Sequence, residues 1–365
     1  MDFVFSPEQD ALRAAVRAFM GAEAPKAYVR RMAEDDDVGV TPEVWAKIVD
    51  LGWTGVLVPE KQGGLGLGIV DAVVVQEEMG RATFPGPYFS SAILATLAAR
   101  ALGLDDLLSG LASGSARGTV AFDEPGYGDP IARIRVRADG RGTRFKLDGV
   151  KPFVLDGCSA DWVLVPARTR EGLQTFLVEG TNAQAAASLD ITRKFARIEF
   201  ETAPAQLVGP VGDHTAIWRR VADDAAVLLA AELTGVSEAA NKTALDYAQD
   251  RIVFDKPLSK FQVTRHKAVD MLHRIEMAKV GVQYAAWASD SEAPDRESAA
   301  AMAKAYAGEA ANYIAAECLQ IHGGIGFTWE NESHIYLRRA KVNDLMLGYQ
   351  GWQRERVADL YFAAL

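Results

Sequence analysis

The segment RIRVRADGRGTRFKLDG, residues Arg133–Gly149, sets the fold class of this chain. Polar and apolar residues alternate along it, with glycine-containing turn residues near its middle. An alternation with a period of two places one side of a strand against a core and the other side in water. The segment therefore predicts an antiparallel β-hairpin with one solvated face.

Further β-rich runs lie on both sides of this hairpin. They begin with GTVAF at Gly118 and continue with DWVLVPAR, LQTFLVEG and ARIEFE, separated by turn residues. Short strands punctuated by turns are typical of compact β structure. We therefore expect a small β-barrel or sandwich over residues 118–209.

Helical patterns flank the β region on both sides. Before it, Ser6-Pro7-Glu8-Gln9 combines a serine N-cap, a proline at the first helical position and a glutamine placed as in a capping box. After it, apolar residues recur at spacings of three and four from Leu229 to Tyr247. The sequence predicts an α+β multidomain protein that is mainly α. Its predicted parts are an N-terminal helical domain (1–117), a middle β domain (118–209) and a C-terminal four-helix-bundle domain (210–365).

Composition excludes several classes of function. The net charge of -10 argues against nucleic acid as a partner, because phosphate binding requires concentrated lysine and arginine. The two cysteines, Cys158 and Cys318, form no CxxC pair, so we expect neither a disulfide framework nor a metal site. The N-terminus lacks the pattern of a signal peptide, and no uncharged apolar run approaches the roughly 20 residues of a membrane span. A cytoplasmic protein without a membrane partner is expected.

Several motifs, in order along the chain, resemble one flavoenzyme family. They are MDFVFSPEQDALRAAVRAFM from Met1, LGWTGVLVPEKQGGLGLG from Leu51, DYAQDRIVFDKPLSKFQVTRHKAVDM from Asp246 and QIHGGIGFTWE from Gln320. Together with the helical, β and helical order, these motifs resemble the acyl-CoA dehydrogenases over essentially the whole chain. The resemblance implies the acyl-CoA dehydrogenase fold.

The resemblance also implies a reaction and a cofactor. Such enzymes oxidise an acyl-CoA thioester to its α,β-enoyl product, with a carboxylate as base and FAD as hydride acceptor, and pass electrons to an electron-transfer flavoprotein. Each FAD lies at an interface between two subunits. One subunit holds the flavin ring, and its neighbour holds the pyrophosphate and adenine end. Each chain thus carries two half-sites.

The half-site that serves the neighbour is nearly intact, and we call it the neighbour half. A guanidinium suits a pyrophosphate, and glycines let backbone amides approach it. Asp255, where the family usually has glycine, is a departure. The alternative is that Arg251 is a solvated helix charge and that Gly323-Gly324 is only a turn between helices. The residues that match the family motifs are Arg251, Phe254, Phe261, Gln262, Gln320, Gly323 and Gly324.

The half-site kept for the chain's own flavin departs from the family pattern, and we call it the own half. Asp123 replaces a threonine, Asp129 replaces a serine, and Phe153-Val154-Leu155 replaces Trp-Ile-Thr. The family run Tyr-Glu-Gly-Thr, which carries the base, is matched to Tyr349-Gln350-Gly351-Trp352. An amide such as Gln350 cannot accept a carbon-bound proton at neutral pH, so in this match the residue at the family's base position is not a base.

Some family members carry the base on the first long helix of the bundle. Counting back from Arg251 places that position near Ala225 and Ala226, which are not bases. The adjacent Asp224 is a candidate substitute, but a shift of one residue turns a helix position by about 100°. The alternative is that Asp224 is an acid favoured by the helix dipole. Of the remaining candidates, Glu232 and Glu238 are interpreted as bundle charges or partner contacts, and His322 as a structural or adenine-side neighbour.

Three hypotheses follow. In the first, this chain is a non-catalytic subunit of a heteromeric acyl-CoA dehydrogenase and completes the FAD site of a paralogous partner. This arrangement resembles the α2β2 enzymes that act on steroid side-chain CoA thioesters in actinobacteria. In the second, the chain is a self-sufficient homotetrameric dehydrogenase with a relocated base. In the third, it is a scaffold protein that has lost flavin chemistry.

Overall fold

A computed structural model describes residues 5–363, and the chain divides into two compact units. The helical unit contains residues up to 29, residues 73–84 and residues from 226 onward. The mixed unit contains residues 30–72 and 85–225. The two units therefore interleave along the chain. The domain boundaries predicted after residues 117 and 209 refer to consecutive stretches of sequence and stay predictions.

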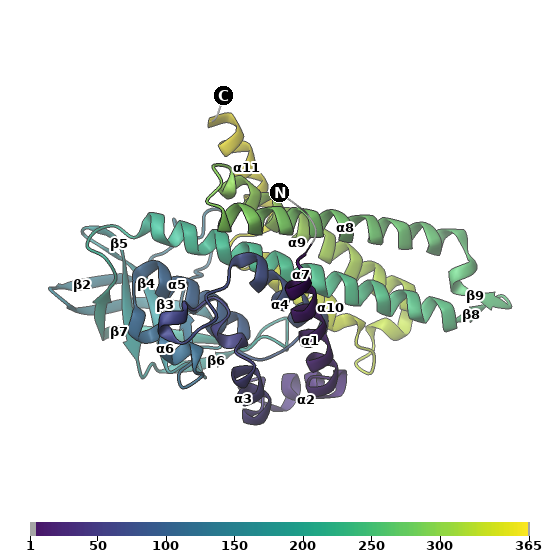
Figure 1. The fold of residues 1–365 in the computed structure, drawn as a ribbon, viewed down its shortest axis with the longest axis horizontal. Helices are drawn as coiled ribbons and strands as arrows, with labels where there is room; N and C mark the ends of the chain where they lie inside the picture. Colours follow the sequence, from purple (N-terminus) through teal and green to yellow (C-terminus); the bar gives the residue numbers. More distant parts are fainter. Residues whose placement is uncertain (1–4, 364–365) are drawn as a thin grey trace. The chain divides into compact units, whose positions relative to one another are not determined.

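Helices form both ends of the chain, as the sequence predicts (Figure 1). The first helix begins with the predicted capping box, in which Gln9 N donates to Ser6 Oγ at 3.2 Å and Ser6 N donates to Gln9 Oε1 at 3.0 Å. The helices are α1 (Pro7–Glu23), α2 (Lys26–Asp35), α3 (Pro42–Asp50), α4 (Ile69–Ala82), α5 (Thr96–Leu102), α6 (Asp105–Ala112), α7 (Thr215–Asp250), α8 (Gln262–Asp290), α9 (Arg296–His322), α10 (Ser333–Leu345) and α11 (Gln350–Ala363). Tyr88–Ala95 forms a buried π-helix, η3.

The mixed unit is built around a β-barrel. Strand β4 pairs with both β2 and β5, so the order β4-β2-β3-β7-β5 closes on itself. Closure leaves these strands without a free edge. The strands are β1 (Gly118–Val120), β2 (Arg137–Arg141), β3 (Arg144–Leu155), β4 (Trp162–Thr169), β5 (Gly172–Glu179), β6 (Ala183–Ala186) and β7 (Phe195–Val208). A separate hairpin contains β8 (Ile252–Val253) and β9 (Lys256–Pro257).

The predicted hairpin is confirmed as β2 and β3. The two strands are antiparallel, with Arg137 opposite Asp148 and Arg141 opposite Arg144. Apolar side chains from several strands form the core of the barrel. Along the strands of the hairpin, side chains that face this core therefore alternate with side chains that face water. Between barrel and sandwich, the structure selects the barrel.

The helical unit combines α1 and most of α4 with the C-terminal helices. Within it, α8 packs beside α9, which also packs against α10 and α11 (Figure 1). The crossing of α4 and α7 is close, because a Cβ on Gly80 would lie 2.1 Å from Glu232 O and one on Gly235 would lie 1.8 Å from Glu77 O. Only glycine permits this approach.

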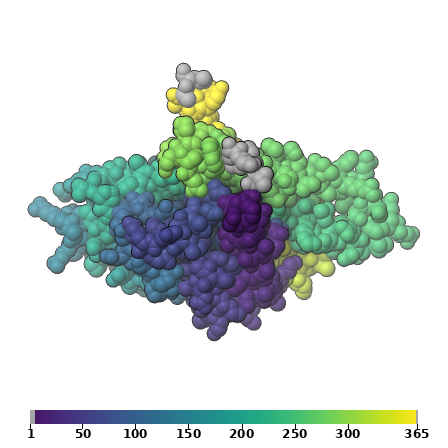
Figure 2. Space-filling view, in the orientation of Figure 1, coloured from purple at the N-terminus to yellow at the C-terminus, as the bar shows by residue number. Residues whose placement is uncertain are grey.

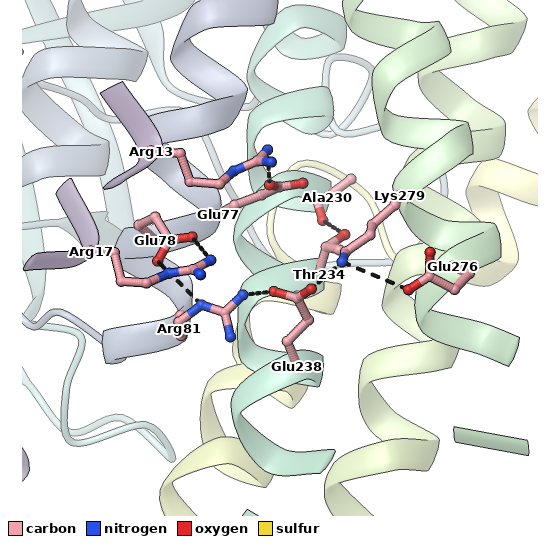
Figure 3. A network of polar contacts seen from close by, with 10 residues as sticks. All are labelled: Arg13, Arg17, Glu77, Glu78, Arg81, Ala230, Thr234, Glu238, Glu276 and Lys279. Carbon is pink, nitrogen blue, oxygen red and sulfur yellow. Dashed lines mark hydrogen bonds and ion pairs between the residues drawn. The ribbon is translucent and has the colours of Figure 1, made fainter. Parts of the chain in front are cut away.

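Ion pairs join α1, α4, α7 and α8 around this crossing (Figure 3). They are Arg13–Glu77, Arg17–Glu78, Arg81–Glu238 and Lys279–Glu238. Burial raises the pKa of Glu77, although Arg13 opposes this effect. Glu238 is therefore a charge within the bundle, as one of the sequence-based alternatives had it.

Candidate functional site

The neighbour half lies at one end of the helical unit. Helix α7 ends there, α8 begins there and α9 ends there. The rings of Tyr247, from α7, and His322, from α9, stack with centroids 4.4 Å apart, which holds the two helix ends together. The β8–β9 hairpin lies at the right-hand tip of Figure 1, within the green region at the right of Figure 2. The structure therefore brings together residues that are up to about 70 positions apart in the sequence, from Arg251 to Gly324.

Arg251 is exposed immediately after α7. Its backbone carbonyl accepts a hydrogen bond from Leu258 N at 2.8 Å, which fixes the loop around it. Among residues 5–363, no acidic side chain forms an ion pair with the Arg251 guanidinium. A guanidinium left without an internal partner is suited to an anion from outside the chain.

Gly323 and Gly324 form an open backbone surface after α9. Gly323 has φ 65° and ψ -143°, a conformation that essentially only glycine adopts. A Cβ added at either glycine meets no atom within 4 Å. The glycines are thus not needed for side-chain packing within the chain. The Gly323 amide donates to Leu319 O and Gln320 O, whereas Gly324 is exposed. An exposed guanidinium and exposed glycine backbone at one end of the helical unit suit an anionic group such as a pyrophosphate.

The departure at Asp255 has a local explanation. Phe254 and Asp255 form the turn between β8 and β9, with φ of 47° and 59°. Aspartate tolerates this left-handed conformation better than most residues, so it substitutes for the usual glycine. The Phe254 side chain is 86% exposed, whereas Phe261 packs beneath Lys256, whose Nζ lies 4.3 Å from the ring centroid.

His322 has a structural role. Its ring stacks on Tyr247, and its Nδ1 lies 2.8 Å from Cys318 O. Burial raises the pKa of the Cys318 thiol to about 12, so the cysteine is not a nucleophile at neutral pH. Both residues hold the end of α9 against the bundle.

The acidic residues of the own half are neutralised within the mixed unit. Asp123 forms an ion pair with Arg133 at 3.4 Å. Asp129 forms one with Arg219 and also accepts a hydrogen bond from Ile131 N at 2.9 Å. Burial alone would raise the pKa of Asp129, but these hydrogen bonds lower it below its usual value. Neither carboxylate is therefore arranged as a proton acceptor.

The Phe153–Leu155 segment presents apolar side chains. Phe153 is 50% exposed, and Val154 and Leu155 are buried. The backbone carbonyl of Leu155 accepts a hydrogen bond from Thr119 Oγ1 at 2.6 Å. An exposed ring at Phe153 can stack on a flavin, but this segment offers no side-chain hydrogen bond to one.

A buried ion pair beside Asp123 was not predicted from the sequence. Lys151 Nζ lies 2.8 Å from Glu124 Oε1, and both side chains are almost fully buried. Glu124 also accepts hydrogen bonds from the backbone amides of Arg135 and Val136. Burial lowers the pKa of Lys151, whereas Glu124 opposes that effect. The signal in the sequence for this buried pair is Lys151 itself, a charged residue within the otherwise apolar run of residues 150–155.

The loop between α10 and α11, residues 346–349, is the elbow where the base position is expected. Gln350 is the first residue of α11, so Gln350 and Gly351 lie in the helix. Within the elbow, Leu347 and Gly348 both have left-handed backbone, with φ of 56° and 97°. The Glu-Gly pair of the family motif can also be matched to Leu347-Gly348, because Leu347 is likewise followed by a glycine. The structure therefore adds Leu347 as a second candidate for the base position. Neither position carries a carboxylate.

Trp352 packs onto the elbow. A Cβ on Gly348 would lie 2.3 Å from the Trp352 ring, so glycine is required for this contact. The half-buried indole therefore occupies space directly beside the loop.

The alternative base positions on α7 offer no free carboxylate. Ala225 and Ala226 are buried. Asp224 Oδ2 accepts a hydrogen bond from Arg220 Nε at 2.8 Å, one helical turn away. Glu232 is buried and pairs with Arg339 at 2.6 Å, so it is a bundle charge.

A cavity of about 260 Å³ lies in the helical unit between α1, α2, α4 and α10. None of the predicted site residues lines it. Its charged groups are paired with each other, for example Lys26 with Glu332 at 2.8 Å and Arg17 with Glu78 at 2.7 Å. Arg81, the remaining charged residue of the lining, pairs with Glu78 at 3.2 Å and with Glu238, so each charged side chain of the cavity has an ion-pair partner within the chain.

Within residues 5–363, no group of three or more histidine, cysteine, aspartate or glutamate side chains is arranged to hold a metal ion. Over the same range, no helix has both the length and the apolar character that crossing a bilayer requires.

Sequence comparison identifies the family. The profile of the acyl-CoA dehydrogenase N-terminal domain matches residues 6–104, and that of the C-terminal domain matches residues 215–361. The acyl-CoA dehydrogenase IpdE2 of Mycolicibacterium smegmatis is 30% identical over 94% of this chain and 95% of its own length. This chain belongs to the acyl-CoA dehydrogenase family.

Another curated relative is longer than this chain. The acyl-CoA dehydrogenase FadE34 of Mycobacterium tuberculosis is 35% identical over 97% of this chain, but the match spans 48% of FadE34. This chain therefore spans about half the length of that relative.

Solved structures confirm the fold, with its N-terminal helical part, central β-barrel and C-terminal helical part. The Tcur3481-Tcur3483 steroid ACAD G363A variant superimposes with a TM-score of 0.90, 28% identity and coverage of 98% of both chains. The ChsE4-ChsE5 complex from Mycobacterium tuberculosis gives a TM-score of 0.88, 26% identity and the same coverage.

Proposed function

We propose that this chain is a subunit of an FAD-dependent acyl-CoA dehydrogenase, in which it completes the FAD site of a paralogous partner without supplying the catalytic base. The reaction is the α,β-dehydrogenation of an acyl-CoA thioester. The observation that carries the proposal is the unequal condition of the two half-sites. Polar groups of the neighbour half are available to a ligand, whereas those of the own half are absent or already paired.

The neighbour half supports the cofactor assignment. Arg251 is exposed without an internal ion-pair partner, and Gly323 and Gly324 expose their backbone. In the partner's site, Arg251 would pair with the pyrophosphate, and the exposed backbone of Gly324 would approach the same group. Gln262 and Gln320 are exposed near the same helix ends and would contact the adenine side.

The own half supports the absence of a base. Gln350 and Leu347 are not basic, and Asp224 is paired with Arg220. FAD, when bound, supplies the hydride acceptor. In this scheme the chain's own residues bind and orient the cofactor, and the partner supplies the carboxylate that removes the α-proton.

The relatives support a substrate class and an assembly. One similar structure is titled a steroid ACAD and another a complex of two differently named chains, ChsE4 and ChsE5. We therefore propose a steroid side-chain CoA thioester as substrate, an α2β2 heterotetramer as the assembly, and an electron-transfer flavoprotein as the electron acceptor. The proposed cellular location is the cytoplasm.

The decisive measurement is FAD bound per chain, with and without the paralogous partner. The chain alone is expected to purify with little flavin, and the co-expressed enzyme with about one FAD for every two chains. Flavin-rich, active protein from this chain alone would support the self-sufficient homotetramer. An absence of flavin in both preparations would support the scaffold hypothesis.

A second measurement asks whether one carboxylate restores a base. Gln350→Glu and Leu347→Glu, each made singly in the chain alone, are expected to restore little dehydrogenase activity, because Asp123, Leu155 and Trp352 still leave the flavin site incomplete. Substantial activity from either variant, measured with an artificial electron acceptor, would contradict the proposal and would also decide which position is the base position.

A further inference from the structure

A buried carboxylate lies directly beside the elbow. Asp344, near the end of α10, is 7% exposed. Its Oδ1 accepts a hydrogen bond from Gln350 N at 3.2 Å, and its Oδ2 accepts one from Gln350 Nε2 at 3.3 Å. Asn312 Nδ2 donates to the same Oδ2 at 3.0 Å. Every one of these donors is an amide, and among residues 5–363 no lysine, arginine or histidine forms an ion pair with the Asp344 carboxylate.

One face of α9 is shaped around Asp344. Lys304, Gly308 and Asn312 are four residues apart and so lie on one side of that helix. Lys304 Nζ, fully buried, donates to Asp344 O at 2.8 Å and to Gly348 O at 3.4 Å. At Gly308, a Cβ would lie only 2.5 Å from Asp344 Oδ1. The lysine therefore fixes the backbone of the elbow, and the glycine leaves room for the carboxylate.

This arrangement distinguishes an amide from a carboxylate at residue 350. Glutamine and glutamate have the same shape, but only glutamine donates from its side chain. A glutamate would place a second, half-buried carboxylate about 3.3 Å from Asp344, and two carboxylates this close cannot both be charged without repulsion. The Lys304 side chain, which also lies at this end of α10, donates to the backbone carbonyls of Asp344 and Gly348.

We propose that Asp344 is a positioning residue that selects an amide at residue 350 and thereby keeps a carboxylate out of this end of the elbow. The proposal rests on the proposed function, because it explains why the non-catalytic state is built into this chain. Asp344 caps the first turn of α11 through Gln350 N and holds the Gln350 side chain at the same time. A single change to glutamate would break both interactions.

The test is thermal unfolding of the full chain between pH 5 and pH 8. Gln350→Glu is expected to lower the Tm by about 5 °C at pH 8, from the lost hydrogen bond and the repulsion. The difference in Tm between Gln350→Glu and the unsubstituted chain should narrow to about 2 °C at pH 5. The deficit narrows because the introduced glutamate is more often protonated at pH 5 than at pH 8, which weakens its repulsion with Asp344.

Two matched variants separate the causes. Gln350→Met removes the amide without adding charge, so its deficit relative to the unsubstituted chain should not depend on pH. Asp344→Asn combined with Gln350→Glu restores an amide and a carboxylate in reversed order, and it should recover at least about half of the Tm lost at pH 8.

Three results would overturn the proposal. They are a Gln350→Glu chain as stable as the unsubstituted one at pH 8, a deficit as independent of pH as that of Gln350→Met, and a double variant no more stable than Gln350→Glu. The measurement needs neither flavin nor partner. Its failure would leave the proposed function untouched, and a failed FAD stoichiometry would leave the selection by Asp344 untouched.

Discussion

The neighbour half and the elbow differ in where their polar groups find partners. At the neighbour half, Arg251 is exposed and has no ion-pair partner among residues 5–363, and the two glycines face open space. At the elbow, Asp344 is buried and accepts three hydrogen bonds from amides, and Lys304 is bonded to two carbonyls. The Arg251 side chain of the neighbour half has no ion-pair partner among residues 5–363, whereas the polar side chains at the elbow are hydrogen-bonded within the chain.

The difference supports the proposal that the neighbour half meets another molecule. An exposed guanidinium contributes little to the stability of its own chain. A buried, satisfied polar cluster rigidifies its own chain and leaves nothing for a ligand. The barrel residues of the own half resemble the elbow in this respect, because Asp123, Asp129 and Glu124 all have partners within the mixed unit.

Removal of Lys151 should have the largest effect. Lys151→Met leaves the buried Glu124 carboxylate without its cation, and it is expected to lower the free energy of unfolding by about 3–5 kcal/mol. Lys146→Met, at an exposed position of the same strand, is the control and should be nearly neutral. Urea denaturation measures both.

The double variant Glu124→Gln/Lys151→Met sharpens this test. Removal of both charges should recover at least about half of the loss, because the uncompensated buried charge is gone. A small effect of Lys151→Met alone would contradict the view that the barrel side of the own half is organised for internal stability.

Arg251→Ala should show the opposite behaviour. It is expected to lower FAD affinity of the two-chain enzyme by about 10- to 100-fold, as expected for loss of one charge-assisted pair. The Tm of this chain alone should not change, because Arg251 has no internal ion pair to lose. Arg100→Ala, at another exposed arginine, is the control and should change neither quantity. If Arg251→Ala lowered the Tm of this chain without lowering FAD affinity, Arg251 would serve the stability of its own chain, and the comparison would be contradicted.

Asp129→Asn should have the smallest effect, and it should depend on pH. Hydrogen bonding to Arg219 outweighs burial and lowers the pKa of Asp129, so this group stabilises the fold above its unfolded pKa near 3.8 and loses that contribution as pH falls. Because the pair is partly exposed, the deficit at pH 7 should be below about 1 kcal/mol. Chemical denaturation at pH 7 and pH 3.5 should show a smaller deficit at pH 3.5 than at pH 7. Asp139→Asn, at an exposed position of β2, is the control, and equal deficits at both pH values would exclude the ion pair as the cause.

Local sequence patterns predicted the elements well. The capping box at Ser6, the hairpin of β2 and β3 and the long helix before Arg251 all follow from residues close together in the chain. The spacing of apolar residues and the capping of helices depend on residues close together in the chain, so they can be predicted without knowledge of the fold. The exposure of Arg251 agrees with its predicted availability to a neighbour, but its contact with FAD stays a prediction.

The elbow shows where spacing along the chain was insufficient. Both Gln350-Gly351 and Leu347-Gly348 present a residue followed by glycine, and the sequence alone selected the first. Only the backbone reveals that Leu347 and Gly348 form the left-handed turn while Gln350 begins α11. The two candidates differ in structural context, and neither supplies a base.

The sequence by itself determined the order of helices and strands, the family resemblance and the unequal chemistry of the two half-sites. Only the tertiary structure decided that Asp344 meets Gln350 and Asn312, that Lys151 is buried against Glu124, and that α1 belongs with the C-terminal helices. The physical reason is range. Helix and strand signals arise between residues a few positions apart, whereas burial and the partner of a charge depend on which distant segments the packed chain brings together.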